Sequence, residues 1–357
     1  MKESTCWGRK NVRAFAATIE VRNPARVIAA YRASRQAVRW PVPIDAHPSM
    51  SAHRREFVRA LAEKSVPEIL RSYVYFSVAE MERMLRLASR YVLLEPLRGI
   101  GLELGAGSGL LSSLVARSRE VDAIFAVEIC EEAADLLLPK VARWVLGDEA
   151  HKVVPIIGSF DNLLLPDNSL DFAIEIDAYH HSDDLRVTFT ECARVLKPGG
   201  WLLCFDRCWP DDHPDWDIER LLSLQYTPEF LAANGYPPDL KLTRRENGEH
   251  EYKLREWRAG FEAAGFELCR LCKFWRAVPT REAIKAALSI LPLSLRRRLY
   301  EPGEERFVTF RWWLTQRWRT LWRNVAGPKD LAAPARWPQM NIFAPRETSV
   351  LLLRKKR

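Results

Sequence analysis

The stretch LELGAGSG, residues 102–109, places three glycines two positions apart directly behind an apolar run. Glycine loses more chain entropy on folding than other residues, so three of them in one turn need a structural reason. A strand ending at Leu104 and a helix capped by Ser108 would leave the glycines in the turn between them. In such a turn a ligand can lie against the backbone, with its anion at the helix N-terminus.

Glu128 is the second feature that points to a ligand. It stands nineteen residues beyond Gly109, after a second apolar run, where a carboxylate can accept both hydroxyls of a ribose. A dinucleotide fingerprint would have a third small residue at Leu110, which argues against NAD. The alternative is that the glycines allow tight helix packing and that Glu128 is a surface acid.

Apolar patterning from residue 100 onward predicts an α/β fold. Short apolar runs alternate there with amphipathic helical stretches, as in a parallel sheet with crossover helices. Strands are predicted at residues 101–104, 123–127, 152–157, 171–176, 201–205, 266–275 and 349–353. Helices are predicted at residues 52–64, 78–92, 109–117, 131–143, 184–195 and 251–264. The basic start of the chain, broken by WPVP at residues 40–43, is predicted to be irregular.

Composition excludes several classes of protein. With 357 residues, 48% hydrophobic and 28% charged, the chain can bury a full core, so it is neither disordered nor a coiled coil. No apolar run approaches the roughly 20 residues that span a bilayer, and the start does not look like a secretory signal, so we expect a cytoplasmic protein. Seven scattered cysteines indicate reduced thiols, and the CxxC pair Cys269 and Cys272 lacks partners for a zinc site.

Four motifs, in order across residues 98–265, resemble the class I S-adenosylmethionine-dependent methyltransferases, specifically the type 11 or small-molecule branch. They are LELGAGSG (102–109) with VEI (127–129), GSFDNLLLPDNSLD (158–171), DFAIEIDAYHH (171–181) and ARVLKPGGWLL (193–203). The resemblance implies a doubly wound, seven-stranded mixed sheet that finishes with an antiparallel hairpin. It also implies a methyltransferase domain over residues 98–357 with helical insertions at 207–250 and 277–348, preceded by an N-terminal helical cap region, residues 1–97.

The resemblance also assigns the contacts of S-adenosylmethionine. The expected contact residues are Glu103, Gly105, Gly107, Gly109, Glu128, Ile129, Ser159, Phe160 and Glu175. Glu103 would lie near the ammonium group, the glycines beneath the methionine part, and Glu128 at the ribose. One departure is Ser159, because the family usually has an aspartate there to accept from the adenine amine. A neutral serine oxygen should bind that amine more weakly.

Methyl transfer from a sulfonium is an in-line displacement, in which positioning does most of the work. A hydroxyl acceptor must also lose a proton, and a histidine or carboxylate at the rim of the site could take it. The candidates for this catalytic role are His181, His250 and Glu249, with His180 beside them. Each histidine could instead be a hydrogen-bonded loop residue. Asp206, Asp211 and Asp212 could hold a metal, but clustered loop acids more often solvate a turn, so no metal is expected.

The expected function is therefore methyl transfer from S-adenosylmethionine to a small molecule or glycan, most simply at oxygen. An RNA methyltransferase is one alternative, although residues 175–178 read EIDA where amino-methylating enzymes carry an NPPY-like tetrad. A non-catalytic protein that only binds partners through the cofactor fold is the other alternative.

The net charge of +8 is concentrated in one segment. Residues 279–347 hold thirteen Lys or Arg against six Asp or Glu. Within them, residues 306–325 have helical spacing, with one apolar face and with Arg319 and Arg323 opposite. This pattern fits a helix docked on the domain, or a peripheral contact with a membrane or with a lipid-linked or phosphate-bearing acceptor.

Overall fold

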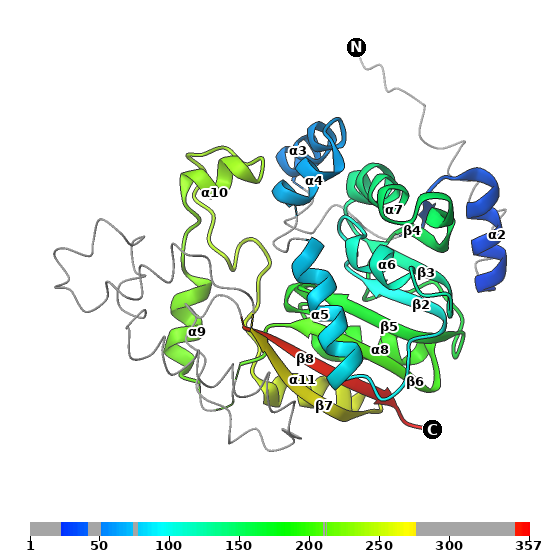
Figure 1. The fold of residues 1–357 in the computed structure, drawn as a ribbon. Coiled ribbons are helices and arrows are strands. Elements are labelled where there is room, and N and C mark those ends of the chain that lie inside the picture. The colour runs from blue at the N-terminus through cyan, green and yellow to red at the C-terminus, as the bar shows by residue number, and fades with distance from the viewer. Residues whose placement is uncertain (1–22, 42–50, 74–77, 210, 212, 276–346) are drawn as a thin grey trace, which may run out of the picture.

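A single eight-stranded sheet forms the centre of the computed structural model (Figure 1). The structure describes residues 23–41, 51–73, 78–209, 211, 213–275 and 347–357. The strands are β1 (Val38–Arg39), β2 (Gly99–Leu104), β3 (Val121–Glu128), β4 (Val153–Ile157), β5 (Leu170–Ile176), β6 (Leu196–Asp206), β7 (Phe266–Trp275) and β8 (Glu347–Lys355). Their order is β1-β4-β3-β2-β5-β6-β8-β7. Strands β1 to β6 pair in parallel, while β8 is antiparallel to both β6 and β7. The predicted α/β class and antiparallel hairpin are confirmed.

Strand β1 makes the sheet eight-stranded rather than seven-stranded. Val38 pairs with Ile156 on the outer edge of β4, and the amide of Trp40 continues the ladder with a 2.8 Å bond to the Ile157 carbonyl. Two residues are too few to show an alternating pattern, so no strand was predicted there. The prediction of an irregular start is wrong for residues 24–39, which form helix α2 (Pro24–Ser34) and β1. The helix had a signal in the sequence, because Asn23 caps it and a proline occupies its first turn.

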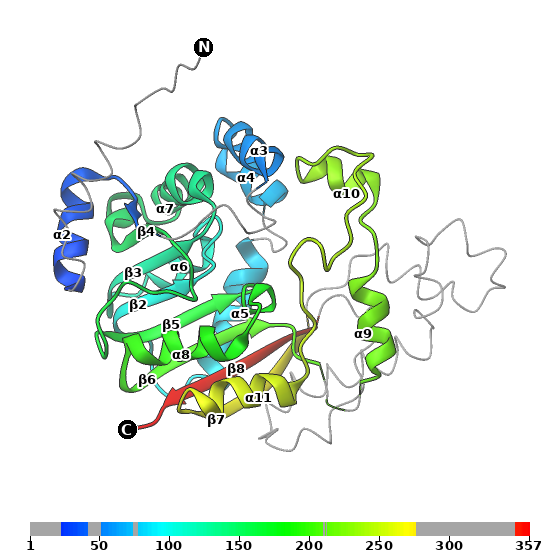
Figure 2. The ribbon, with the colours of Figure 1, turned by 180° about the vertical axis from the view of Figure 1, so that it is seen from behind.

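Helices cover both faces of the sheet. On the face seen in Figure 1 lie α5 (Val78–Tyr91), α6 (Leu110–Val115) and α7 (Leu138–Leu146). On the opposite face, in Figure 2, lie α8 (Leu185–Val195) and α11 (Leu254–Ala263). Every residue of β4 is buried, as expected for a parallel sheet covered on both sides.

The remaining helical elements include several that differ from the prediction. They are α3 (Ala52–Ala62), α4 (Val66–Tyr73), η2 (Ala133–Leu137), η3 (Gly147–Lys152), η4 (Tyr179–His181), α9 (Asp215–Leu222) and α10 (Pro228–Ala233). The helix predicted over residues 131–143 contains η2, a π-helical turn that ends two residues before Pro139. Proline has no amide hydrogen and cannot make the regular bond to the preceding turn, which favours this wider turn.

The segment predicted to be the first insertion, residues 207–250, begins at the carboxyl edge of the sheet. Because β8 is antiparallel to β6, the start of β8 marks the carboxyl end of β6. Figure 1 shows α9 and α10 beyond that end. Residues 276–346, which contain nearly all of the basic segment, lie outside the described residues. No helix in the described ranges is long and apolar enough to cross a membrane.

Candidate cofactor and acceptor site

The glycine turn between β2 and α6 has a left-handed backbone at all three glycines. The φ angles are 66° at Gly105, 52° at Gly107 and 73° at Gly109. A Cβ on Gly105 would lie 2.6 Å from that of Ala178, and one on Gly109 would lie 2.6 Å from Leu138 Cγ. Two of the glycines thus permit close packing as well as a bare turn. The predicted N-cap at Ser108 is wrong, because α6 begins one residue later and Gly109 takes the cap position.

Glu128 closes this turn from the end of β3. One carboxylate oxygen accepts the amide of Gly107 at 2.7 Å, and the other accepts the amide of Cys130 at 2.8 Å. The residue is only 8% exposed, and burial raises the pKa of its carboxyl group. Glu128 is therefore not a surface acid. Each of its oxygens has a second lone pair that could accept a hydroxyl.

Glu103 lies on β2, two residues before Gly105. Its carboxylate accepts the amide of Ser112 at 3.0 Å and also the Ser112 hydroxyl, which ties the strand to α6. Burial raises the pKa of Glu103 to about 8, against the opposing effect of these two hydrogen bonds. The carboxyl group is therefore largely protonated near neutral pH when no cation lies beside it.

The loop that follows β4 lies beside the glycine turn. A Cβ on Gly105 would lie 3.8 Å from the Phe160 ring, which itself meets the Tyr179 ring edge-on at 6.3 Å. The Ser159 hydroxyl accepts the amide of Asp161 at 3.1 Å and so stabilises the loop's own turn. Ile129, directly after β3, is partly buried against the apolar cluster beneath α3.

The N-terminal helices contribute two residues that the sequence did not single out. A Cβ on Gly107 would lie 3.4 Å from the ring of Tyr73. The Arg54 guanidinium stacks on that ring at 4.9 Å and donates to the Asn234 carbonyl at 3.2 Å, in the first insertion. These contacts join α3, the glycine turn and the loop after α10. Nothing in the local sequence around Tyr73 indicates this, because its partners are distant in the chain.

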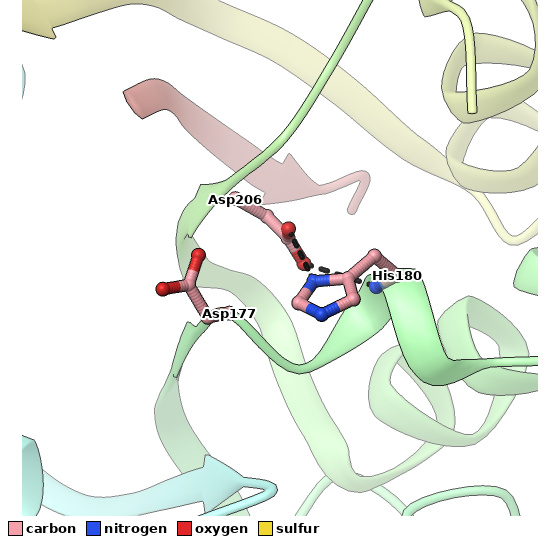
Figure 3. Close-up of side chains that lie close together, drawn as sticks. All are labelled: Asp177, His180 and Asp206. Atoms are coloured by element: carbon pink, nitrogen blue, oxygen red, sulfur yellow. Dashed lines mark hydrogen bonds and ion pairs between the residues drawn. The ribbon is translucent and has the colours of Figure 1, made fainter. Parts of the chain in front are cut away.

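Acidic residues and a histidine gather where β5 and β6 end, as Figure 3 shows. His180 Nδ1 lies 2.7 Å from one Asp206 oxygen, and the His180 amide donates to the other oxygen at 3.0 Å. Asp177 lies directly after β5 and has a left-handed φ of 48°. Its carboxylate, His180 and Asp206 each offer a ligand atom within 4.8 Å of the others. This pairing of His180 with Asp206 was not predicted.

Glu175 lies beside this group, inside the sheet. It pairs in register with Cys204, so Asp206, two residues further along β6, faces the same side. One Glu175 oxygen accepts the Ala178 amide at 3.2 Å, and the other is buried with no hydrogen-bond partner. Burial, followed by the charge of Asp206, raises the pKa of Glu175 well above its usual range.

The two neighbouring histidines are held as neutral rings. Burial, followed by the charge of Arg207, lowers the pKa of His180 to about 4. Burial and the adjacent His180 ring lower the pKa of His181 to about 3. His181 Nδ1 lies 3.0 Å from the Gly248 carbonyl, which fixes that nitrogen as the donor. The ring centroids are 4.3 Å apart.

The other two proton-acceptor candidates lie in the stretch after α10. Glu249 lies 2.8 Å from both Arg207 and Arg244. Although burial alone would raise it, the two arginines hold the pKa of Glu249 well below its usual range. A carboxylate so stabilised is a poor proton acceptor. His250 is half-buried and lies 3.1 Å from Asp183.

The loop acids do not form the cluster considered from sequence. Asp211 accepts the amide of Arg255 at 2.6 Å, at the start of α11. Asp212 lies outside the described residues. Asp206 instead lies in a group of potential metal ligands with Asp177 and His180. Within the described parts of the chain, Cys269 and Cys272 belong to no group of three such side chains.

The strand order, the left-handed glycine turn and the buried acid at the end of β3 are typical of α/β domains that bind a nucleoside cofactor at the carboxyl edge of the sheet. Residues 102–204 match the family described as the methyltransferase domain. This segment is a class I S-adenosylmethionine-dependent methyltransferase domain, and S-adenosylmethionine is the cofactor of that class.

Known proteins resemble this chain over part of their length. A sterol 24-C-methyltransferase of Aspergillus fumigatus is 36% identical over 18% of this chain and 19% of its own. An uncharacterized methyltransferase of Mycobacterium tuberculosis is 35% identical over 28% of this chain and 37% of its own. The crystal structure of the YcgJ protein from Bacillus subtilis is 19% identical, with a TM-score of 0.42, covering 79% of this chain and all of that one. The chain therefore matches well under half the length of these two curated relatives.

Proposed function

We propose that this protein transfers the methyl group of S-adenosylmethionine to a small-molecule or glycan acceptor. The observation that carries the proposal is the bond from Gly107 to Glu128, which holds a buried carboxylate beside a bare backbone turn. Glu128 would accept the ribose hydroxyls, Glu103 would face the ammonium group, and the loop of Ser159 and Phe160 would face the adenine.

The acceptor would lie at the ends of β5 and β6, beneath the first insertion. An oxygen acceptor fits this position, because histidines and carboxylates crowd it. In the transfer, an acceptor oxygen lone pair forms the bond to the methyl carbon while the carbon–sulfur bond breaks and its electron pair stays on sulfur. The acceptor proton leaves to a basic group or to water.

For the proton acceptor we propose His181 or His250. Glu249 has two arginine partners that oppose proton uptake. His181 Nδ1 donates to the Gly248 carbonyl at 3.0 Å, so the proton would have to be taken by Nε2, against the burial that lowers the pKa of this ring to about 3. His181→Gln and His250→Gln are therefore compared, and the variant that slows transfer while leaving cofactor affinity unchanged identifies the proton acceptor.

Two experiments test the proposed function. Calorimetry with S-adenosylmethionine should show one site per chain, and no binding at millimolar cofactor would contradict the proposal. Labelled methyl groups supplied with a cell extract should then enter one of its separated lipid, glycan, RNA or protein fractions. Label in a small-molecule, lipid or glycan fraction supports the proposal.

An RNA methyltransferase is the second candidate, favoured by the basic residues of segment 279–347. Label that enters RNA alone, with transfer that weakens as salt is raised, would favour this reading. Binding of the cofactor with no transfer to any fraction would favour the non-catalytic alternative.

A further inference from the structure

We propose that Asp177, His180 and Asp206 form a binding site for one divalent cation of the Mn²⁺ type, at the position of the methyl acceptor. The three residues come from the ends of adjacent parallel strands, β5 and β6, and their ligand atoms lie within 4.8 Å of one another (Figure 3). Binding of the cation stands by itself, whereas its use in methyl transfer rests on the proposed function.

The distance between His180 and Asp206 suits a cation. Nδ1 and the carboxylate oxygen lie 2.7 Å apart and share a proton. Two donor atoms on one such cation, each bonded at about 2.1 Å, lie about 3 Å apart. For this pair of atoms, replacing the shared proton by a cation needs a movement of only a few tenths of an ångström, and binding should release that proton. The Asp177 carboxylate, whose ligand atom lies within 4.8 Å of the other two, would turn toward them to complete the set (Figure 3).

The surroundings hold the ligand atoms in place. The Asp206 carboxylate is fully buried and also accepts the backbone amides of His180 and Arg207. Such outer hydrogen bonds orient ligating carboxylates in metal sites. Asp177 extends from the other strand end, and its left-handed backbone is a conformation that few non-glycine residues adopt.

A third acid lies next to the site. Glu175, which faces the same side as Asp206, has a buried oxygen with no hydrogen-bond partner. Arg207 is the opposing charge. It is paired with Glu249 at 2.8 Å and Glu251 at 3.0 Å, and a cation would have to bind beside it.

The ligand types indicate which cation fits. One imidazole and two carboxylates form a mixed nitrogen and oxygen set, which suits a first-row transition ion better than Mg²⁺, whose preferred ligands are all oxygens. Three protein ligands leave coordination positions open. In the methyltransferase reaction, an acceptor hydroxyl at an open position would lose its proton more readily and would be aimed at the methyl carbon.

Manganese binding to the whole chain tests the site. Protein dialysed against EDTA is titrated with Mn²⁺, and the free ion is followed by electron paramagnetic resonance. We expect one ion per chain, bound at least tenfold more weakly by Asp177→Asn and Asp206→Asn. Asparagine keeps the shape of Asp177 and tolerates its left-handed backbone, so this variant should fold even where Asp206→Asn fails to do so.

Asp183→Asn is the matched control, because Asp183 is an exposed acid of the same loop, 94% exposed at its side chain. Its Mn²⁺ affinity should equal that of the parent protein. The proposal is overturned if the parent binds no Mn²⁺, or if Asp177→Asn binds it as tightly as the parent does.

A second measurement separates this proposal from the proposed function. S-adenosylmethionine affinity is measured by calorimetry, and methyl transfer is assayed, before and after removal of the cation. Mn²⁺ binding without methyl transfer would support the site and contradict the function. Methyl transfer by protein that binds no Mn²⁺ would contradict the site and support the function.

Discussion

Glu128 is the residue on which the cofactor assignment depends. In the folded chain it holds the amides of Gly107 and Cys130, so it fixes the shape of the turn as well as offering lone pairs to a ribose. Its two roles can be separated by substitution, because glutamine still accepts through one oxygen and alanine accepts through none.

We predict that Glu128→Ala weakens S-adenosylmethionine binding by about 2–4 kcal/mol, since two charge-assisted bonds go with one carboxylate. Glu128→Gln should lie between the parent and the alanine variant. Calorimetry provides the measurement, and Asp122→Ala, at an exposed position of the same strand, is the control. An alanine variant that binds as tightly as the parent would remove Glu128 from the ribose site.

Glu103 leads to a prediction about pH. Its folded-state pKa of about 8 exceeds the ordinary value of a glutamate, so the folded state binds the proton more tightly than the unfolded state does. The free energy of unfolding should therefore fall as pH rises from about 5 to 8, by on the order of 3 kcal/mol from this group.

Glu103→Gln should flatten this decline, because glutamine cannot ionise and can still accept from Ser112. Urea unfolding of the cofactor-free protein at pH 5 and pH 8 gives the comparison. An unchanged pH dependence in the variant would mean that other groups cause the decline.

At the scale of elements, the turn between β2 and α6 also packs against α7. A Cβ on Gly109 would lie 2.6 Å from Leu138, the first residue of α7, and the left-handed backbone adds strain for any side chain. Close helix packing, the alternative explanation predicted for these glycines from sequence, is therefore observed at Gly109.

We predict that Gly109→Ala lowers the free energy of unfolding by about 2–5 kcal/mol, through backbone strain and overpacking together. Gly265→Ala is the control, because Gly265 also has a positive φ, 85°, but has open space around it. Denaturant unfolding of the two variants should differ by the cost of overpacking. Equal losses would show that Leu138 moves aside freely.

Several elements were predicted closely. Strands β3, β5 and β7 and helix α8 were each placed within two residues of their observed bounds, whereas β6 begins at Leu196, five residues before its predicted start. Among the elements that were not predicted, strand β1 has only two residues, too few for a pattern, and the π-helical turn η2 depends on a single proline.

Among the site residues too, those close together in sequence were predicted and those joined only by the fold were not. The turn of Gly105, Gly107 and Gly109 and the acid at Glu128 are close in sequence and were identified from their spacing. The contacts of Asp206 with His180, and of Tyr73 with the glycine turn, join parts of the chain that only the folded sheet brings together. Such contacts have no signature in local sequence.

At the scale of the whole molecule, the basic segment 279–347 is proposed to contact a membrane surface. We predict that the parent protein sediments with anionic vesicles at low salt and that Arg319→Gln with Arg323→Gln reduces this, at about 1 kcal/mol per arginine near the bilayer. Cofactor affinity should be unchanged in the double variant.

The vesicle measurement has two informative controls. Neutral vesicles should bind neither protein, and added salt should release the parent. A parent protein that ignores anionic vesicles would contradict a membrane contact. Retention of transfer RNA in a salt-sensitive manner would instead favour the nucleic-acid reading.

The position of β8 has a consequence for how the chain matures. Residues 276–346 separate β7 from β8, yet β8 is the strand that pairs with both β6 and β7. During synthesis on the ribosome, the backbone groups along one edge of β6 therefore stay unpaired until β8 has emerged. A nascent or prematurely terminated chain would expose that edge, which favours aggregation and binding by chaperones. Folding of this domain is thus completed only once β8 has emerged, long after its cofactor turn has been made.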